Sequence, residues 1–216
     1  MERKKVLVLI DGFNYYHKLA RYQKNNKTCV KWLDYMSLLK AAIKSHLKTF
    51  DFDLEIIFFT AIATHRSKSS QARHKIYIKA LESSGIHVVK GKFKEKHIYP
   101  CFDCKQPRTE KDLLRHEEKH TDVNVAITLL EKAMTNSFDR AYLLSEDNDY
   151  VPVVKRVKEL YPQKEIIICP PPQKKYSVAD LLKASKETDF YRFTWKQINH
   201  FQFPETYNGL NNPWKI

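Results

Sequence analysis

The chain has 216 residues, of which 43% are hydrophobic, and this is enough for one α/β domain with a full core. Its 38 Lys and Arg residues outnumber 25 Asp and Glu residues, and the formal net charge of +13 favours nucleic acid as a partner, although excess lysine that only keeps the chain in solution is the alternative. No apolar run approaches the roughly 18 residues of a membrane span and no secretion signal is evident, so we expect no membrane partner and a reducing, cytoplasmic location.

The first part of the chain alternates short apolar runs with segments of helical periodicity. Strands are predicted at residues 5–10, 54–61 and 86–89. Helices are predicted between them at residues 13–22, 33–47 and 69–84. Gly85 follows the third helix, where a residue without a side chain commonly ends a helix.

The pattern then breaks at a polar, charged stretch, residues 93–115, which we interpret as an irregular insertion covering about 93–118. Helices are predicted after it at residues 121–135, 149–161 and 177–184. Strands are predicted at residues 140–145, 165–169 and, as a last edge strand, 190–193. Residues 1–195 then form one domain, and the aromatic tail, residues 196–216, is expected to pack on it.

Strands that are apolar almost throughout, alternating with helices, are typical of a parallel sheet covered on both faces. The expected fold is therefore a three-layer, Rossmann-like α/β fold with a central, mostly parallel sheet of about five strands flanked by helices. In such folds, ligands bind beyond the carboxyl ends of the strands, beside the point where the strand order reverses.

Acidic residues stand at that edge. Asp11 directly follows the first strand, Asp147 and Asp149 follow the fourth, and Asp122 opens the helix before the fourth strand. The first and fourth strands can be neighbours at the switch point, which would bring four carboxylates together. Crowded carboxylates repel one another unless a cation such as Mg²⁺ or Mn²⁺ neutralises them. The alternative is that each Asp serves only as a helix cap or turn residue.

Three blocks of sequence carry a family resemblance. They are residues 10–14 (Ile-Asp-Gly-Phe-Asn), 121–126 (Thr-Asp-Val-Asn-Val-Ala) and 145–152 (Ser-Glu-Asp-Asn-Asp-Tyr-Val-Pro). In this order they resemble the signature of the NYN domain, a branch of the PIN-like nuclease superfamily, and most closely its LabA-like group. The resemblance covers roughly residues 5–190 and implies a three-layer α/β fold with metal-dependent ribonuclease activity.

Carried over by position, Asp11, Asp122 and Asp147 match the family's metal-binding carboxylates, for Mg²⁺ or Mn²⁺. Asp149 matches a further acid, and Asn14 matches an Asn suited to orienting a water or a phosphate oxygen. One departure is Glu146, where the family commonly has a small residue. An acid at this position could tune the affinity for the metal or could point to solvent.

The resulting hypothesis is a metal-dependent nuclease that hydrolyses RNA, in which water attacks the phosphorus and no His or Ser nucleophile is required. The alternative is a non-catalytic nucleic-acid-binding or regulatory module with the same fold. A phosphatase of another Asp-first family would have a second Asp two residues after Asp11, where this chain has Phe13, and a P-loop is absent. Self-association into a homo-oligomer is compatible with the sequence.

The insertion contains a spacing close to that of zinc sites. Cys101 and Cys104 are followed by His116 and His120, two thiolates and two imidazoles that could complete a tetrahedron around one structural Zn²⁺. His97 or a water could replace His120, and two free thiols in a loop are the alternative. If residues 116–122 were helical, both histidines would share one helix face and a zinc ion would support the helix of Asp122 from behind.

Basic residues also fall near the predicted edge. Arg66 and Lys68 follow the second strand, Arg73 lies one turn into the next helix, and Lys119 precedes Asp122 by three residues. These four side chains are predicted to bind the phosphates of the substrate. The alternative is a solvated, charged loop.

Overall fold

The structure, a computed structural model, describes residues 3–48, 51–97, 114–173, 175–187 and 190–215. Its centre is a five-stranded sheet in the order β3-β2-β1-β6-β7, in which every neighbouring pair is parallel. The strands are β1 (Lys4–Asp11), β2 (Phe52–Thr60), β3 (His87–Lys90), β6 (Arg140–Leu144) and β7 (Glu165–Ile168). The predicted α/β fold with a parallel sheet of about five strands is confirmed.

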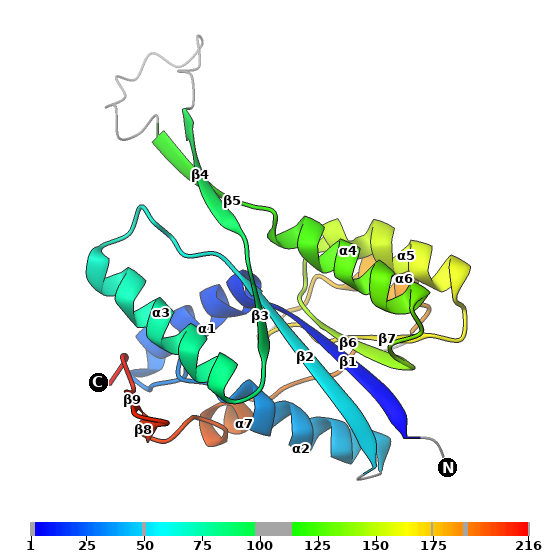
Figure 1. Cartoon of the computed structure of the whole chain (residues 1–216), viewed down its shortest axis with the longest axis horizontal. Helices are drawn as coiled ribbons and strands as arrows, with labels where there is room; N and C mark the ends of the chain where they lie inside the picture. Colours follow the sequence, from blue (N-terminus) through cyan, green and yellow to red (C-terminus); the bar gives the residue numbers. More distant parts are fainter. Residues whose placement is uncertain (1–2, 49–50, 98–113, 174, 188–189, 216) are drawn as a thin grey trace.

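Helices cover both faces of this sheet (Figure 1). One layer contains α1 (Gly12–Asn26), α2 (Tyr35–Leu47) and α3 (Lys68–Ser83), and the other contains α4 (Thr121–Met134), α5 (Val151–Leu160) and α6 (Ala179–Ser185). Successive residues of β1 enter the two cores alternately, because side chains alternate across a strand. Val6, Val8 and Ile10 pack under the first layer, and Leu7 and Leu9 pack under the second. This double burial explains why the strand is apolar throughout.

The switch point lies between β1 and β6, as predicted from the sequence. Ile10 pairs with Leu144, the last residue of β6, so Asp11 and the segment after β6 leave the sheet side by side. Gly12 then starts α1 against β2. A Cβ atom at this glycine would lie 2.5 Å from the ring of Phe58 and 2.7 Å from the carbonyl oxygen of Phe59. Only glycine therefore lets α1 begin this close to the sheet.

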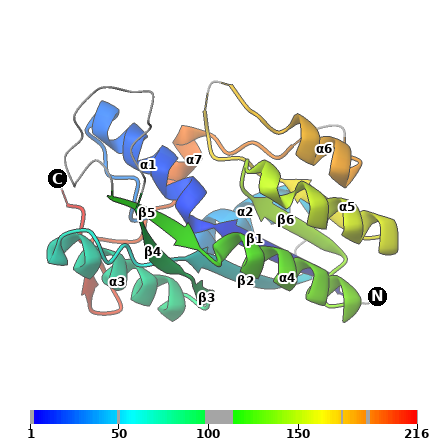
Figure 2. The ribbon, with the colours of Figure 1, turned by 90° about the horizontal axis from the view of Figure 1, so that it is seen from above.

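The insertion is not irregular where the structure describes it, and this part of the prediction is wrong. Strands β4 (Lys92–His97) and β5 (Leu114–Lys119) form an antiparallel ribbon that extends beyond the sheet (Figure 1). Charged side chains occupy both of its faces, so the apolar alternation that normally marks a strand is missing. In Figure 2 the arrow of β5 points to the first turn of α4, which follows after the single residue His120.

The carboxyl-terminal part departs from prediction at one point. Residues 190–194 form no strand, although the backbone N–H of Tyr191 donates to the carbonyl oxygen of Ile168 at 2.9 Å. A short helix, α7 (Trp195–His200), follows and is capped by Thr194. Beyond it, β8 (Thr206–Tyr207) and β9 (Leu210–Asn211) form a small hairpin. Phe203 is buried, and its N–H donates to the carbonyl oxygen of Trp32, which holds the tail on the body.

Among the helices that the structure describes, each one lacks either the length or the apolar character needed to cross a bilayer.

Candidate active site

Asp11 is the buried centre of the carboxyl edge, with only 4% of its surface exposed. One carboxylate oxygen, Oδ1, accepts the backbone N–H of Asn14 at 2.9 Å and so caps α1. The other oxygen, Oδ2, accepts the hydroxyl protons of Ser145 at 3.2 Å and Tyr150 at 3.0 Å. Burial nevertheless raises the pKa of this carboxyl, because desolvation outweighs these hydrogen bonds.

Tyr150 joins two of the predicted acids. It ends the short 3-10 helix η2 (Asn148–Tyr150), and its hydroxyl lies 3.0 Å from Asp11 Oδ2 and 2.9 Å from Asp122 Oδ1. A phenol has one proton and can donate to only one carboxylate at a time. With both carboxylates ionised, the second one faces a lone pair of the phenol oxygen. The pair therefore needs an extra proton or a cation.

Asp147 and Asp149 flank this pair. Asp147 caps η2, and its Oδ1 accepts the backbone N–H of Asp149 at 3.0 Å. The pKa of Asp122 is raised, first by desolvation and then by the negative charges of Asp147 and Asp149. The structure thus brings the four predicted acids into one neighbourhood, with Asp11 inside it and Asp149 at the exposed edge.

Glu118 is a fifth acid, which the sequence analysis missed. It lies on β5, in the stretch interpreted as irregular, and its Oε1 accepts the hydroxyl proton of Thr121 at 2.5 Å. Desolvation raises the pKa of Glu118 to about 7, and the charges of Asp11 and Asp122 add to that rise. The period-two recurrence of Lys at positions 92, 94 and 96 was the available signal for this ribbon.

A raised carboxyl pKa makes stability depend on pH in a defined direction. The folded state holds the proton of Glu118 more firmly than the unfolded chain, so the stability that it contributes is present below the ordinary pKa of 4.5 and is lost as pH rises toward 7. In chelator, we expect Glu118→Gln to be more stable than the wild type at pH 8 and to have a flatter pH profile between pH 4.5 and 7. Urea unfolding at several pH values measures this.

Glu117 supplies the matched control for that experiment. It lies on the opposite face of the ribbon, where Lys119 and Lys96 lower its pKa to about 2. Glu117→Gln is therefore expected to give no gain of stability at pH 8. If the Glu118→Gln protein also shows no gain, Glu118 does not belong to the buried acidic cluster.

The donor chemistry of the edge fits a hard cation, since Mg²⁺ and Mn²⁺ prefer oxygen ligands. Asn14 adds a second sign of a missing partner, because its buried Oδ1 has no hydrogen-bond partner among the described residues. The acidic side chains, however, do not form a complete coordination site as they stand. Across the described ranges, no three His, Cys, Asp or Glu side chains are arranged to hold one metal. Tyr150 explains this for Asp11 and Asp122, since its hydroxyl stands between them.

Glu146, the departure from the family pattern, has a structural role that the sequence did not suggest. Its carboxylate pairs with Lys18 Nζ on α1 at 2.6 Å and accepts a hydrogen bond from Gln173. Its side chain is only 14% exposed. Glu146 therefore ties the segment after β6 to α1 and to the segment after β7, and does not point freely to solvent.

The predicted phosphate-binding residues lie on three different parts of the fold. Arg66 lines a cavity beside α1. Lys68 is the exposed first residue of α3, and Arg73 is half-buried one turn further along. Lys119 ends β5 and pairs with Glu117 at 2.8 Å.

The predicted zinc ligands are only partly described. Cys101 and Cys104 lie outside the described residues, so the zinc site stays a prediction. His116 is in strand β5, so the helical geometry assumed for residues 116–122 is wrong for its first four residues. Its ring stacks on that of His65 at a centroid distance of 4.1 Å, and its Nε2 lies 3.4 Å from Glu95 Oε1. His120 precedes α4 with a φ of 79°.

A three-layer fold with a parallel sheet of this kind is that of the PIN-like nuclease superfamily. Residues 5–190 match the family model of the NYN domain, and the chain belongs to this family of nuclease-type domains.

Two known proteins are similar to this chain. The 6-hydroxy-3-succinoylpyridine 3-monooxygenase HspA of Pseudomonas putida (strain DSM 28022 / S16) is 27% identical over 176 residues, which cover 70% of this chain and 54% of that protein. The chain thus spans about half the length of this relative. The crystal structure of a protein of unknown function from Vibrio parahaemolyticus RIMD 2210633 has a TM-score of 0.53 and 18% identity, covers 90% of this chain and 96% of its own, and supports the fold alone.

Proposed function

We propose that the protein is a metal-dependent ribonuclease that hydrolyses RNA phosphodiester bonds at the carboxyl edge of its sheet. The observation that carries the proposal is the pair of carboxylates, Asp11 and Asp122, that share one phenolic proton beside further acids. Such a cluster is costly unless a cation compensates it. Membership of the NYN family, whose domains are of the nuclease type, agrees with that use of the acids.

Each acid has a distinct role in this proposal. Asp11, Asp122 and Asp147 hold Mg²⁺ or Mn²⁺, and Asp149 adds negative charge on the solvent side. The cation, when bound, polarises a phosphate oxygen and lowers the pKa of a water molecule. Asn14 uses its Oδ1, which has no hydrogen-bond partner in the described part of the chain, to orient a water or accept a hydrogen bond from the substrate. Tyr150 keeps its proton, because burial among carboxylates raises its pKa, and so it remains a hydrogen-bond donor to the cluster.

The β4–β5 ribbon supports nucleic acid as the partner. Directly paired residues of an antiparallel ladder share one face, so the ribbon has an inner and an outer set of side chains. The inner set contains Phe93, Glu95, His116 and Glu118. The outer set contains Lys92, Lys94, Lys96, Arg115, Glu117 and Lys119. Five cations and one acid on the outer face of the ribbon suit the phosphate backbone of a polyanion.

The test is an assay of purified protein on single-stranded RNA, structured RNA and DNA. We expect cleavage of RNA with Mg²⁺ or Mn²⁺ and none with chelator. RNA affinity should fall steeply as salt is raised, because phosphate contacts release counterions. Salt-sensitive RNA binding with no cleavage in either metal would contradict the proposal and favour the non-catalytic module.

A further inference from the structure

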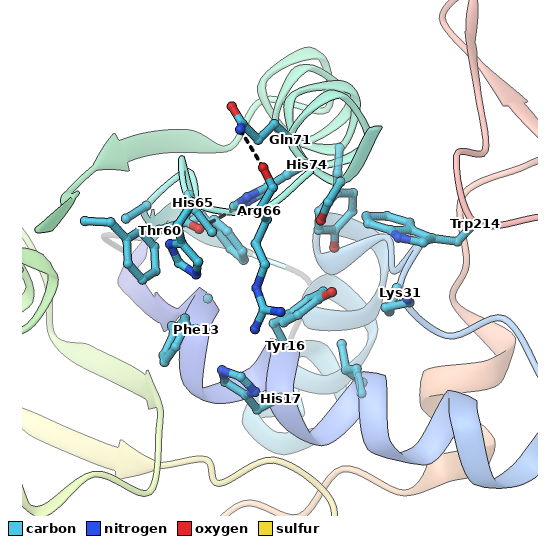
Figure 3. A pocket seen from close by; sticks show the side chains of 18 of the residues that line it. Phe13, Tyr16, His17, Lys31, Thr60, His65, Arg66, Gln71, His74 and Trp214 are labelled. Atoms are coloured by element: carbon cyan, nitrogen blue, oxygen red, sulfur yellow. Dashed lines mark hydrogen bonds between the residues drawn. The ribbon is translucent and has the colours of Figure 1, made fainter. Parts of the chain in front are cut away.

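A cavity of about 460 Å³ opens beside the acidic edge, between α1, α3 and the base of the β4–β5 ribbon (Figure 3). Small-molecule sites commonly measure roughly 300–1,000 Å³, so this one has room for a single nucleotide. Its lining comes from elements that the chain brings together from distant positions. They include the start of α1, the end of β2, the segment before α3, and Trp214 of the tail.

Aromatic rings form walls of the cavity. Phe13 and Tyr16 project from α1 and are 41% and 43% exposed, although large aromatic side chains usually bury more of their surface in a core. Phe93 of the ribbon meets Phe13 edge to face, with ring centroids 6.1 Å apart, so the two rings form one continuous wall. Rings left exposed around a hollow suit a flat, sequence-tolerant partner such as a nucleobase, which stacks on them.

The charge of the cavity is positive. Arg66 and Lys31 line it, and none of the described lining residues is acidic. Figure 3 shows the Arg66 side chain extending toward Tyr16 and His17. No hydrogen bond or ion pair of its guanidinium is recorded within the described ranges, so its donors are available to an anion. Lys31 Nζ lies 5.9 Å from the ring of Tyr16, which places a second cation beside the same wall.

The segment that carries Arg66 is held in place. Gln71 Nε2 donates to the carbonyl oxygens of Thr64 at 2.9 Å and Arg66 at 2.8 Å. Deeper in the cavity, His74 Nε2 and Thr60 Oγ1 are 3.1 Å apart and offer polar atoms to the edge of a bound ring. A rigid support makes a guanidinium a better anion ligand, because less freedom is lost on binding.

The cavity and the acidic cluster share a wall. Gly12 lines the cavity and directly follows Asp11. Phe93 lines it as well and pairs directly with Glu118 across the ribbon, on the same face. A strand of RNA with one base in the cavity and that nucleotide's phosphate on Arg66 can therefore bring the next phosphate along the strand toward Asp11 and Glu118.

We propose that this cavity binds one nucleotide of the RNA substrate, with its base against Phe13, Tyr16 and Phe93 and a phosphate on Arg66. The inference rests on the proposed ribonuclease function and adds to it a subsite that sets which base stands next to the cleaved bond. The cavity would recognise a ligand that combines a flat aromatic ring with an anionic group. A small free aromatic acid also has both features, so the experiment distinguishes it from a nucleotide of RNA.

Binding is measured first, by calorimetry in chelator, so that no cation contributes. The probes are AMP, GMP, CMP and UMP, with ribose 5-phosphate as an anion without a ring and nicotinate as an aromatic acid without a sugar. We expect at least one mononucleotide to bind more tightly than ribose 5-phosphate and nicotinate. Phe13→Ala and Arg66→Ala should each weaken that binding by roughly tenfold or more, since stacking and charged hydrogen bonds are both of this size.

Two exposed residues outside the cavity supply matched controls. Leu160→Ala removes an apolar side chain that is 46% exposed, and Arg156→Ala removes an arginine whose only recorded partner in the described ranges is Glu159 at 3.5 Å. Both should bind the mononucleotide as the wild type does. On RNA, the Phe13→Ala and Arg66→Ala proteins should have a raised KM and an altered base preference at the cleavage position, and the controls should have neither.

The outcomes separate this inference from the proposed function. Unchanged mononucleotide binding by Phe13→Ala and Arg66→Ala overturns the subsite, even if Asp122→Asn abolishes cleavage. Nicotinate binding more tightly than every mononucleotide also overturns it and assigns the cavity to a small aromatic acid. If Asp122→Asn cleaves RNA normally while the two cavity variants lose nucleotide binding, the subsite stands and the proposed acidic centre fails.

Discussion

Replacing Asp11, Asp122 or Asp147 by Asn is expected to lower RNA cleavage in Mn²⁺ by on the order of a hundredfold or more, because a bound cation supplies several kcal/mol of transition-state stabilisation. Asn keeps the size of Asp but loses the charge that holds the ion. The three losses should not add in double variants, since removing one ligand already disables the unit. RNA binding should tighten, because a negative charge facing the polyanion is removed.

The fold of these variants is expected to persist. Asn caps a helix as well as Asp does. An Asn that replaces Asp11 can still accept the backbone N–H of Asn14, and an Asn that replaces Asp147 can still accept that of Asp149. Asp53→Asn is the matched control. Asp53 lies at the amino-terminal end of β2, away from the carboxyl edge of the sheet, and its ion pair with Arg3 is solvent-exposed. Near-normal cleavage by Asp11→Asn and Asp147→Asn, with normal melting temperatures, would rule out this active site.

Among the glycine-to-alanine changes possible in this chain, Gly12→Ala is expected to cause the largest loss of stability. The added Cβ would meet the Phe58 ring at 2.5 Å and the backbone oxygen of Phe59 at 2.7 Å, and the backbone cannot move away without displacing β2. Overpacking of this kind costs about 1–3 kcal/mol, and the close backbone contact places this site at the upper end. Cleavage should fall as well, because a shifted α1 displaces Asp11 and Phe13.

Gly209→Ala is the comparison for that variant. A Cβ there meets no atom of the described residues within 4 Å, but the φ of +75° is unfavourable for alanine, so a cost of about 1 kcal/mol and normal cleavage are expected. Urea unfolding and cleavage rates of the two proteins measure the difference. Equal stabilities of the Gly12→Ala protein and the wild type would show that α1 can move away from β2 freely.

The central fold could be predicted because its signals are local and repeated. In β1, successive apolar residues enter both cores, and this pattern identifies a strand covered on two faces. The position of Asp11 and Asp147 then follows from the rule that neighbouring parallel strands end at one edge. What could not be predicted is the contact between the acids. The hydroxyl of Tyr150 that joins Asp11 to Asp122 depends on the exact placement of η2.

Glu118 was missed for a different reason. Most of the ladder pairs charged or histidine side chains with each other, and the partner of Glu118, Phe93, is a single apolar residue in a charged run. The helix α7 was missed although its signal was present, since Thr194 and Gln197 form a capping box. The aromatic run just before it, residues 190–193, favours a strand by composition, but it has no regular secondary structure, and among the described residues its backbone bond to β7 is the one from Tyr191 to Ile168.

The ribbon leaves the body and returns to it at adjoining points. At Gly91 a Cβ would lie 2.7 Å from the hydroxyl of Thr121, so the residues just outside the two ends of the ribbon touch. A segment with joined ends can grow or shrink with little effect on the fold, since the entropy of closing it rises only slowly with length. The far part of the ribbon is thus open to variation between homologues and to engineered insertion, whereas its base must keep Phe93 and Glu118 in register.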